Sequence, residues 1–185
     1  MTAKSLTIQT NNPFALIQRI PDKWQGYVRS LPSGFLVFDT PLNGARAGWI
    51  NLWNTYLSKG INTPNKIVPI YAPDGGGKNG AYANFIATRL GITTDTPITS
   101  AKQIWELGRA IVFFEAGRDW YPDTQLYEAY NLAKQRVKLP DLTRLSPEQP
   151  VVPGRKEGKK KAPIALIVGA VAALGILTLW IRNRK

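Results

Sequence analysis

Apolar residues recur at helical spacing over residues 41 to 59 and 80 to 90. Thr40 can cap the first of these segments, and Pro41 suits its first helical position. A glycine follows each segment, at positions 60 and 91, where a helix commonly ends. The pattern therefore predicts two amphipathic helices with defined ends.

A third helix is predicted from Ser100 to Gly117, because Ser100 and Gln103 form a capping-box pattern ahead of an apolar run. A fourth is predicted over residues 124 to 137, with Asp123 or Thr124 as its cap. The sequence thus indicates a mainly α domain.

The shorter segments carry weaker signals. GFLVFD, residues 34 to 39, is predicted as a strand, and residues 22 to 34 as a loop. Asn11-Asn12-Pro13 is a turn or helix-start signal, and residues 13 to 20 predict a short helix. Residues 63 to 71 predict a helix broken by Pro69. The fold class expected is an α+β, mainly helical domain with one short strand or hairpin.

The C-terminal region has a different composition. Residues 163 to 181 contain no charged side chain, and a helix of this length reaches about 28 Å, close to the thickness of a bilayer's hydrocarbon core. Cations flank both ends, and Trp180 lies at one of them. We therefore expect a domain over 1 to 138, a Pro-rich basic linker over 139 to 162, a transmembrane helix over 163 to 181 and a basic tail over 182 to 185.

The net charge of +12 is concentrated in this region. From Arg155 onward there are eight basic residues and one Glu, a net charge of +7, which leaves +5 on residues 1 to 154. This distribution argues against a nucleic-acid-binding chain and favours contact of the basic run 155 to 161 with anionic lipid headgroups. Because no signal peptide is visible, the N-terminal domain is expected on the cytoplasmic side.

The chain has no Cys and no His, which excludes thiol chemistry, imidazole bases and the usual zinc sites. The cluster Gly75-Gly76-Gly77-Lys78 lacks the remainder of a phosphate-loop motif. No cofactor and no metal are predicted, so any catalysis depends on carboxylates or hydroxyls.

Glu115 is the carboxylate that the helical period singles out. It falls on the same stripe as the apolar residues Ile104, Leu107, Gly108, Ile111 and Val112. Desolvation and the helix C-terminus would both raise its pKa, as a glycosidase-type general acid requires. The alternative is a structural Glu that binds Arg46, Arg89 or backbone amides. Tyr71, Tyr82, Trp120 and Tyr121 are candidates for stacking on sugar rings, although aromatics at such spacing are also common core residues.

Several segments, in order, resemble a family of bacteriophage and prophage virion structural proteins with a lysozyme-like domain. They are NNP, FLVFDTPLNGARAG, LWNTYLSKGINTPNKIVPIYAP, NGAYANFIATRLGI and IVFFEAG, within residues 11 to 117. The positions that match the family pattern are Asn11, Asn12, Pro13, Phe38, Asp39, Pro41, Gly44, Asn62, Thr63, Ala72, Pro73, Asn79, Tyr82, Gly91, Glu115 and Gly117. Two positions depart from it: Phe14 stands where the family has a glycine, and Phe114 where it has a histidine before the glutamate.

The resemblance implies two functions, which we keep open here. One is a virion-associated, membrane-anchored lytic transglycosylase or muramidase that acts on host peptidoglycan, with Glu115 as acid and Asp39 or Asp119 as a possible second carboxylate. The other is a non-catalytic membrane protein that links the viral internal membrane to capsid proteins. Both place the chain in a virion internal membrane, and in the host inner membrane during assembly.

Overall fold

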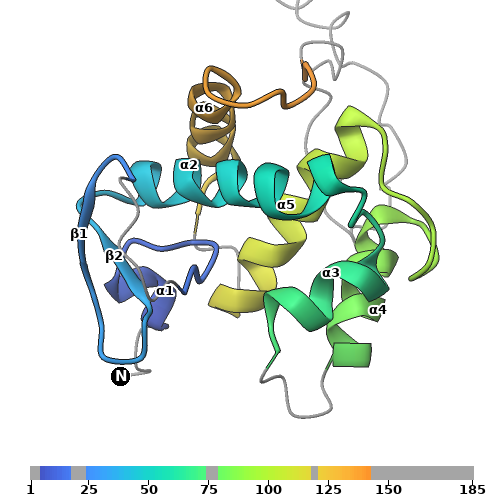
Figure 1. Ribbon diagram of the computed structural model, residues 1–185, viewed down its shortest axis with the longest axis horizontal. Coiled ribbons are helices and arrows are strands. Elements are labelled where there is room, and N and C mark those ends of the chain that lie inside the picture. Colours follow the sequence, from blue (N-terminus) through green and yellow to red (C-terminus); the bar gives the residue numbers. More distant parts are fainter. Residues whose placement is uncertain (1–4, 18–23, 74–78, 118–120, 143–185) are drawn as a thin grey trace, which may run out of the picture. The chain divides into compact units, whose positions relative to one another are not determined.

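The structure is a computed structural model that describes residues 5–17, 24–73, 79–117 and 121–142. The chain divides into two compact units, residues 1–149 and 150–185, and every described residue belongs to the first. The described part is mainly helical with one small sheet, which confirms the expected mainly α class (Figure 1).

The N-terminal segment begins with the short helix α1 (Leu6–Gln9) and does not form the helix expected over residues 13 to 20. That prediction is wrong for the part described, because the fully buried side chain of Asn12 takes the backbone groups that a helix would use. Its Nδ2 donates to the carbonyls of Leu16 and Leu36, and its Oδ1 accepts from the Leu16 amide. Ala15 has a φ of 50°, which also interrupts helical geometry.

The sheet consists of β1 (Tyr27–Ser30) and β2 (Leu36–Phe38), which pair antiparallel. The strand expected at residues 34 to 39 is confirmed, whereas the loop expected over residues 22 to 34 is wrong where β1 lies. β1 escaped prediction because its two middle residues are both exposed, so it lacks the alternation of a half-buried strand. In β2, Leu36 and Phe38 point into the core.

The long helix expected after Thr40 is confirmed at both ends. In α2 (Pro41–Asn51), the Thr40 side chain accepts from the Asn43 amide. The helix continues as a π-helical turn, η1 (Leu52–Tyr56), and a 3₁₀ turn, η2 (Leu57–Lys59). Gly60 ends it with a φ of 74°, a conformation that glycine adopts without steric cost.

The next two helices are α3, which lacks the break predicted from its sequence, and α4, which agrees with its prediction. α3 (Pro64–Tyr71) runs through Pro69, so the predicted break is wrong: Thr63 caps the helix, and three of its residues are buried. Packing compensates for the hydrogen bond that proline cannot donate. α4 (Asn79–Leu90) is confirmed, and Gly91 follows it at a φ of 65°.

α5 (Ala101–Ala116) has the predicted capping box at Ser100 and Gln103 and the predicted glycine end at Gly117. α6 (Asp123–Lys134) is present, but no side chain caps it, since Pro122 occupies that position. Asp123 instead accepts a 2.8 Å bond from the Arg109 guanidinium, which ties the first turn of α6 to α5. The expected cap by Asp123 or Thr124 is therefore wrong.

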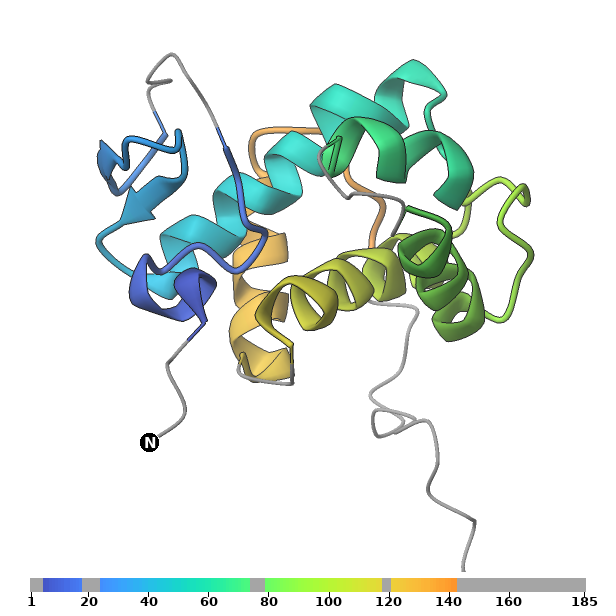
Figure 2. The ribbon, with the colours of Figure 1, turned by 90° about the horizontal axis from the view of Figure 1, so that it is seen from below.

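Trp49, on α2, is the centre of the core and is fully buried. Its indole donates a 3.2 Å hydrogen bond to the Leu126 carbonyl of α6, and its ring stacks on Trp105 of α5 at 5.6 Å. A Cβ on Gly108 would lie 2.0 Å from the Trp49 ring, so α5 reaches this distance only because residue 108 is glycine. α2 thus packs along α6 (Figure 2), and it contacts α5 through the ring of Trp49.

The described chain extends past α6 to residue 142. Leu139 and Leu142 are buried, and the Tyr130 hydroxyl donates a 2.7 Å bond to the Pro140 carbonyl, so the first residues of the expected linker pack on the domain. Within the ranges described, no helix has the length and apolarity to cross a membrane. The predicted span over 163 to 181 and the basic run 155 to 161 lie outside the described residues.

Candidate active site

The capping box and Gly117 fix both ends of α5, and this places Glu115 in its last turn. The buried side chains expected on the same stripe, among them Ile104, Leu107 and Ile111, do face the core. The position of Glu115 on the inward side of α5, as the helical period indicates, is confirmed, although its side chain keeps partial exposure.

Glu115 is held by a tyrosine. The hydroxyl of Tyr82, on α4, donates a 2.9 Å hydrogen bond to Glu115 Oε1, and Tyr82 is only 3% exposed. Burial raises the pKa of Glu115 above its ordinary 4.5, while the hydrogen bond from Tyr82 lowers it; burial is the larger effect. Glu115 is therefore a carboxyl group that keeps its proton to higher pH than an exposed glutamate.

Two more tyrosines surround this pair. Burial raises the pKa of both Tyr71 and Tyr82, and the negative charge of Glu115 raises each further. Tyr56 lies with its ring centroid 5.8 Å from that of Tyr71, and burial raises its pKa to about 12. The Tyr71 hydroxyl donates to the Phe14 carbonyl. We refer to Glu115, Tyr56, Tyr71 and Tyr82 as the Glu115 cluster.

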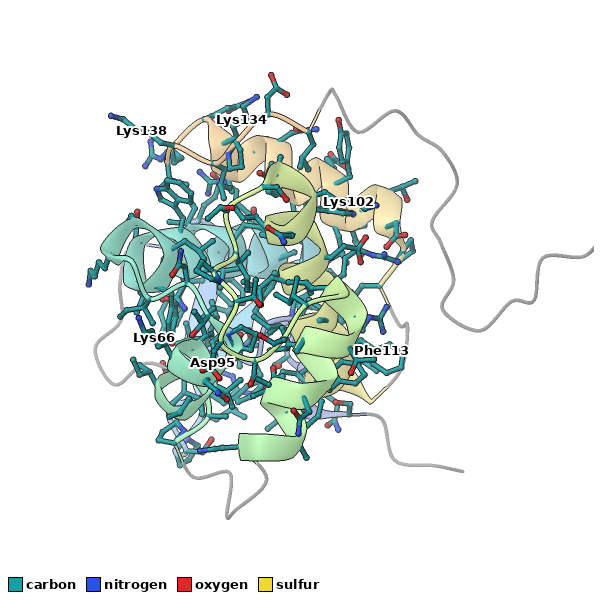
Figure 3. All side chains as sticks on the ribbon, turned by 90° about the vertical axis from the view of Figure 1, so that its right-hand side faces the viewer. Lys66, Asp95, Lys102, Phe113, Lys134 and Lys138 are labelled. Carbon is teal, nitrogen blue, oxygen red and sulfur yellow. The ribbon has the colours of Figure 1, made fainter. Side chains whose placement is uncertain are left out.

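The arginine partners considered for Glu115 lie elsewhere. The guanidinium of Arg89 lies over the rings of Phe85 and Phe113, at 5.5 and 4.7 Å from their centroids (Figure 3 labels Phe113). Arg46 lines a separate cavity. Over the ranges that the structure describes, the ion pairs are Glu106–Arg109, Arg109–Asp123 and Lys134–Asp141. Glu115 is thus not neutralised by an arginine of the described chain.

Phe114, at the position where the family that the sequence resembles has histidine, contributes an apolar ring beside Glu115. It stacks on Tyr82 with 3.7 Å between centroids and 9° between planes, and it is 37% exposed. The exposed ring was not among the expected sugar-stacking residues. The sequence signal that could have found it is its place next to Glu115 at the end of the apolar run of α5.

Two of the other expected site residues, Tyr121 and Asp39, are described and lie outside the Glu115 cluster. Tyr121 is 9% exposed, and its hydroxyl donates a 2.9 Å bond to the Thr7 carbonyl, an interaction that anchors α1. Asp39 is exposed at the start of α2, where a hydrogen bond from Asn43 is the main cause that lowers its pKa. Trp120 and Asp119 lie outside the described residues, as does the glycine cluster 75 to 77.

A cavity of about 350 Å³ is present on another part of the domain. Its lining residues are Trp24, Gln25, Arg46, Ile50, Asn54, Arg136 and Val137. Glu115 is not among them, so a sugar-binding groove beside Glu115 stays a prediction. Among the residues described, no group of three or more acidic side chains is placed to hold a metal ion.

No model of a known protein family matches the chain, and no curated protein matches it.

Proposed function

We propose that the helical domain is lysozyme-like and cleaves host peptidoglycan as a lytic transglycosylase or muramidase, in a virion protein anchored in the viral membrane by residues 163 to 181. The observation that carries this proposal is the state of Glu115: a largely enclosed carboxyl group with a raised pKa and a tyrosine, not an arginine, as its partner. A carboxyl group whose pKa is raised by burial is the kind of group that protonates a glycosidic oxygen.

The transglycosylase reaction suits this arrangement better than the muramidase reaction. Glu115 gives its proton to the leaving oxygen, a hydroxyl of the same sugar attacks the anomeric carbon, and the carboxylate then takes the proton of that hydroxyl. This sequence needs one carboxylate. The donor Tyr82 stabilises the ionised form of Glu115 between the two proton transfers. Asp39, the described alternative for a second carboxylate, makes its hydrogen bonds at the start of α2.

The second candidate is a non-catalytic membrane protein that links the viral internal membrane to the capsid. The observation that favours it is Phe114, because this ring places no titratable group beside Glu115 where the family that the sequence resembles has histidine. In this case the basic run 155 to 161 would bind anionic lipid headgroups, and the helical domain would contact capsid proteins.

The experiment that tests the proposal is the clearing of a purified peptidoglycan suspension by the full chain in neutral detergent. Glu115→Gln is compared with Glu128→Gln, which removes an exposed carboxylate from α6. We expect clearing by the native chain and by Glu128→Gln, loss of clearing by Glu115→Gln, and anhydro-sugar ends in the products. Hydrolysed, reducing ends would indicate the muramidase reaction. Absence of clearing by the native chain would support the second candidate.

A further inference from the structure

The cavity lined by Arg46 and Arg136 is separate from the Glu115 cluster, and the two share no residue. α2 contributes Arg46 and Ile50, the π-helical turn η1 contributes Asn54, and the turn after α6 contributes Arg136 and Val137. We call it the arginine cavity. The packing of α6 along α2 brings its two arginines to one space from positions ninety residues apart in the sequence.

The arginine cavity carries uncompensated positive charge. Among the residues that the structure describes, no carboxylate lines it and neither arginine takes part in an ion pair. The nearest acidic residue in sequence to Arg136 is Asp141, whose Oδ2 lies 3.1 Å from the Lys134 ammonium (Figure 3 labels Lys134). Burial lowers the pKa of Arg46, and the charge of Arg136 lowers it further. Arginine nevertheless stays protonated at neutral pH, so both charges persist.

Two guanidinium groups that line one cavity are a recognition element for an oxyanion. Each is a planar fork of N–H donors that matches the oxygens of phosphate or carboxylate. A phosphate monoester carries a charge of about −1.5 to −2 at neutral pH, which balances two arginines, whereas a carboxylate balances one. The charge of the arginine cavity therefore favours phosphate.

The cavity is larger than a lone anion requires. A water molecule takes about 30 Å³ of the liquid, so 350 Å³ corresponds to the space of several such molecules. Trp24, Ile50 and Val137 give it apolar walls, while Gln25 and Asn54 add amide groups. This combination suits a ligand with a charged end and a less polar body.

We propose that the arginine cavity binds a phosphate monoester, with the phosphate oxygens between Arg46 and Arg136 and the attached organic body against Trp24 and Val137. The ligand has two sources with this chemistry, a soluble phosphate ester and the headgroup of a phosphatidic-acid-type lipid. The proposal is independent of peptidoglycan cleavage.

The test uses the full chain in neutral detergent at constant ionic strength, titrated calorimetrically with three probes. They are inorganic phosphate, glycerol 3-phosphate and a water-soluble short-chain phosphatidic acid. We expect glycerol 3-phosphate to bind, and the double variant Arg46→Gln/Arg136→Gln to raise its dissociation constant by about tenfold or more, since each lost interaction is a charge-assisted hydrogen bond. The matched control is Arg29→Gln/Lys66→Gln, which removes two exposed cations outside the cavity and should leave binding unchanged.

The probes also separate the two sources. Tighter binding of the short-chain phosphatidic acid than of glycerol 3-phosphate assigns a lipid headgroup, and equal binding assigns a soluble phosphate ester. Failure of all three probes to bind the native chain overturns the proposal, as does equal weakening by the control pair. Thermal unfolding of both double variants checks their fold, and Arg136→Gln alone, at a surface turn, provides a second variant that should weaken binding.

Discussion

The hydroxyl of Tyr82 donates a 2.9 Å hydrogen bond to Glu115 Oε1, and this contact joins α4 to the last turn of α5. Two opposite effects act on Glu115 as a result. Burial favours its neutral form, and the tyrosine donor favours its ionised form. The balance between them determines both the acid strength of Glu115 and the pH dependence of the domain's stability.

Ionisation of Glu115 is expected to destabilise the fold. Because burial raises the pKa of the folded state above 4.5, the folded state holds the proton more tightly than the unfolded state. The contribution to stability is therefore complete below about pH 4.5 and is lost as the pH rises through the raised pKa. Glu115→Gln, which stays neutral, should gain stability relative to the native chain as the pH goes from 4 to 8.

Urea denaturation of both proteins across this range measures the difference in the free energy of unfolding. Glu128→Gln, with its exposed side chain, should show no such trend. A difference between Glu115→Gln and the native chain that stays constant with pH would contradict the prediction.

Tyr82→Phe removes the donor and keeps the ring that stacks on Phe114. The pKa of Glu115 should rise further, because the interaction that lowers it is lost. Carbon NMR of the Glu115 carboxyl group during a pH titration measures this shift. At pH 8 the free energy of unfolding should fall by about 1–3 kcal/mol, since the buried carboxylate loses a hydrogen bond. Tyr127→Phe, on the exposed side of α6, is the control and should change neither quantity.

Gly108→Ala should destabilise the domain by about 1–3 kcal/mol or more, because its Cβ would meet the fully buried Trp49 ring at 2.0 Å. The same substitution at Gly80 meets no atom within 4 Å and lies in the first turn of α4, so it should be neutral or stabilise by up to about 1 kcal/mol. Thermal and urea unfolding distinguish the two. Similar effects at both positions would show that α5 is not held at contact distance from Trp49.

Asn12→Ala should cost about 2–4 kcal/mol, because three hydrogen bonds to Leu16 and Leu36 are lost in a fully buried place. Asn12→Asp should lower the free energy of unfolding more at pH 8 than at pH 4. The ionised carboxylate would be buried next to the carbonyls of Leu16 and Leu36, which need a hydrogen-bond donor. Urea unfolding at both pH values measures this. Asn131→Ala, exposed on α6, is the reference and should change stability little.

The ends of α2 and α5 were predictable because their signals are local. Thr40 with Pro41, and Ser100 with Gln103, satisfy amides within their own first turn, and Gly117 supplies the left-handed end of α5. The helix expected over residues 13 to 20 was wrong because a distant residue decides the conformation there. Residues 14 to 17 are not helical because Asn12 bonds Leu16 and also the Leu36 carbonyl, a partner twenty-four residues away.

The candidate site divides in the same way. The inward position of Glu115 follows from the period of one helix. Its partner Tyr82 lies thirty-three residues away on another helix, so the sequence indicated both residues without indicating their hydrogen bond. The arginine cavity was not anticipated at all, because Arg46 and Arg136 meet only through the packing of α6 on α2.

The ring of Phe14 fills the space that a side chain at position 48 would occupy. A Cβ on Gly48 would lie 2.1 Å from the Phe14 ring, which is fully buried and also meets Trp49 edge to face at 5.2 Å. A sequence with glycine at position 14 would leave that volume for a side chain on α2. Positions 14 and 48 are therefore expected to covary among chains of this architecture, with a large side chain at one position and a small one at the other. This paired exchange is a means to recognise distant relatives of this chain.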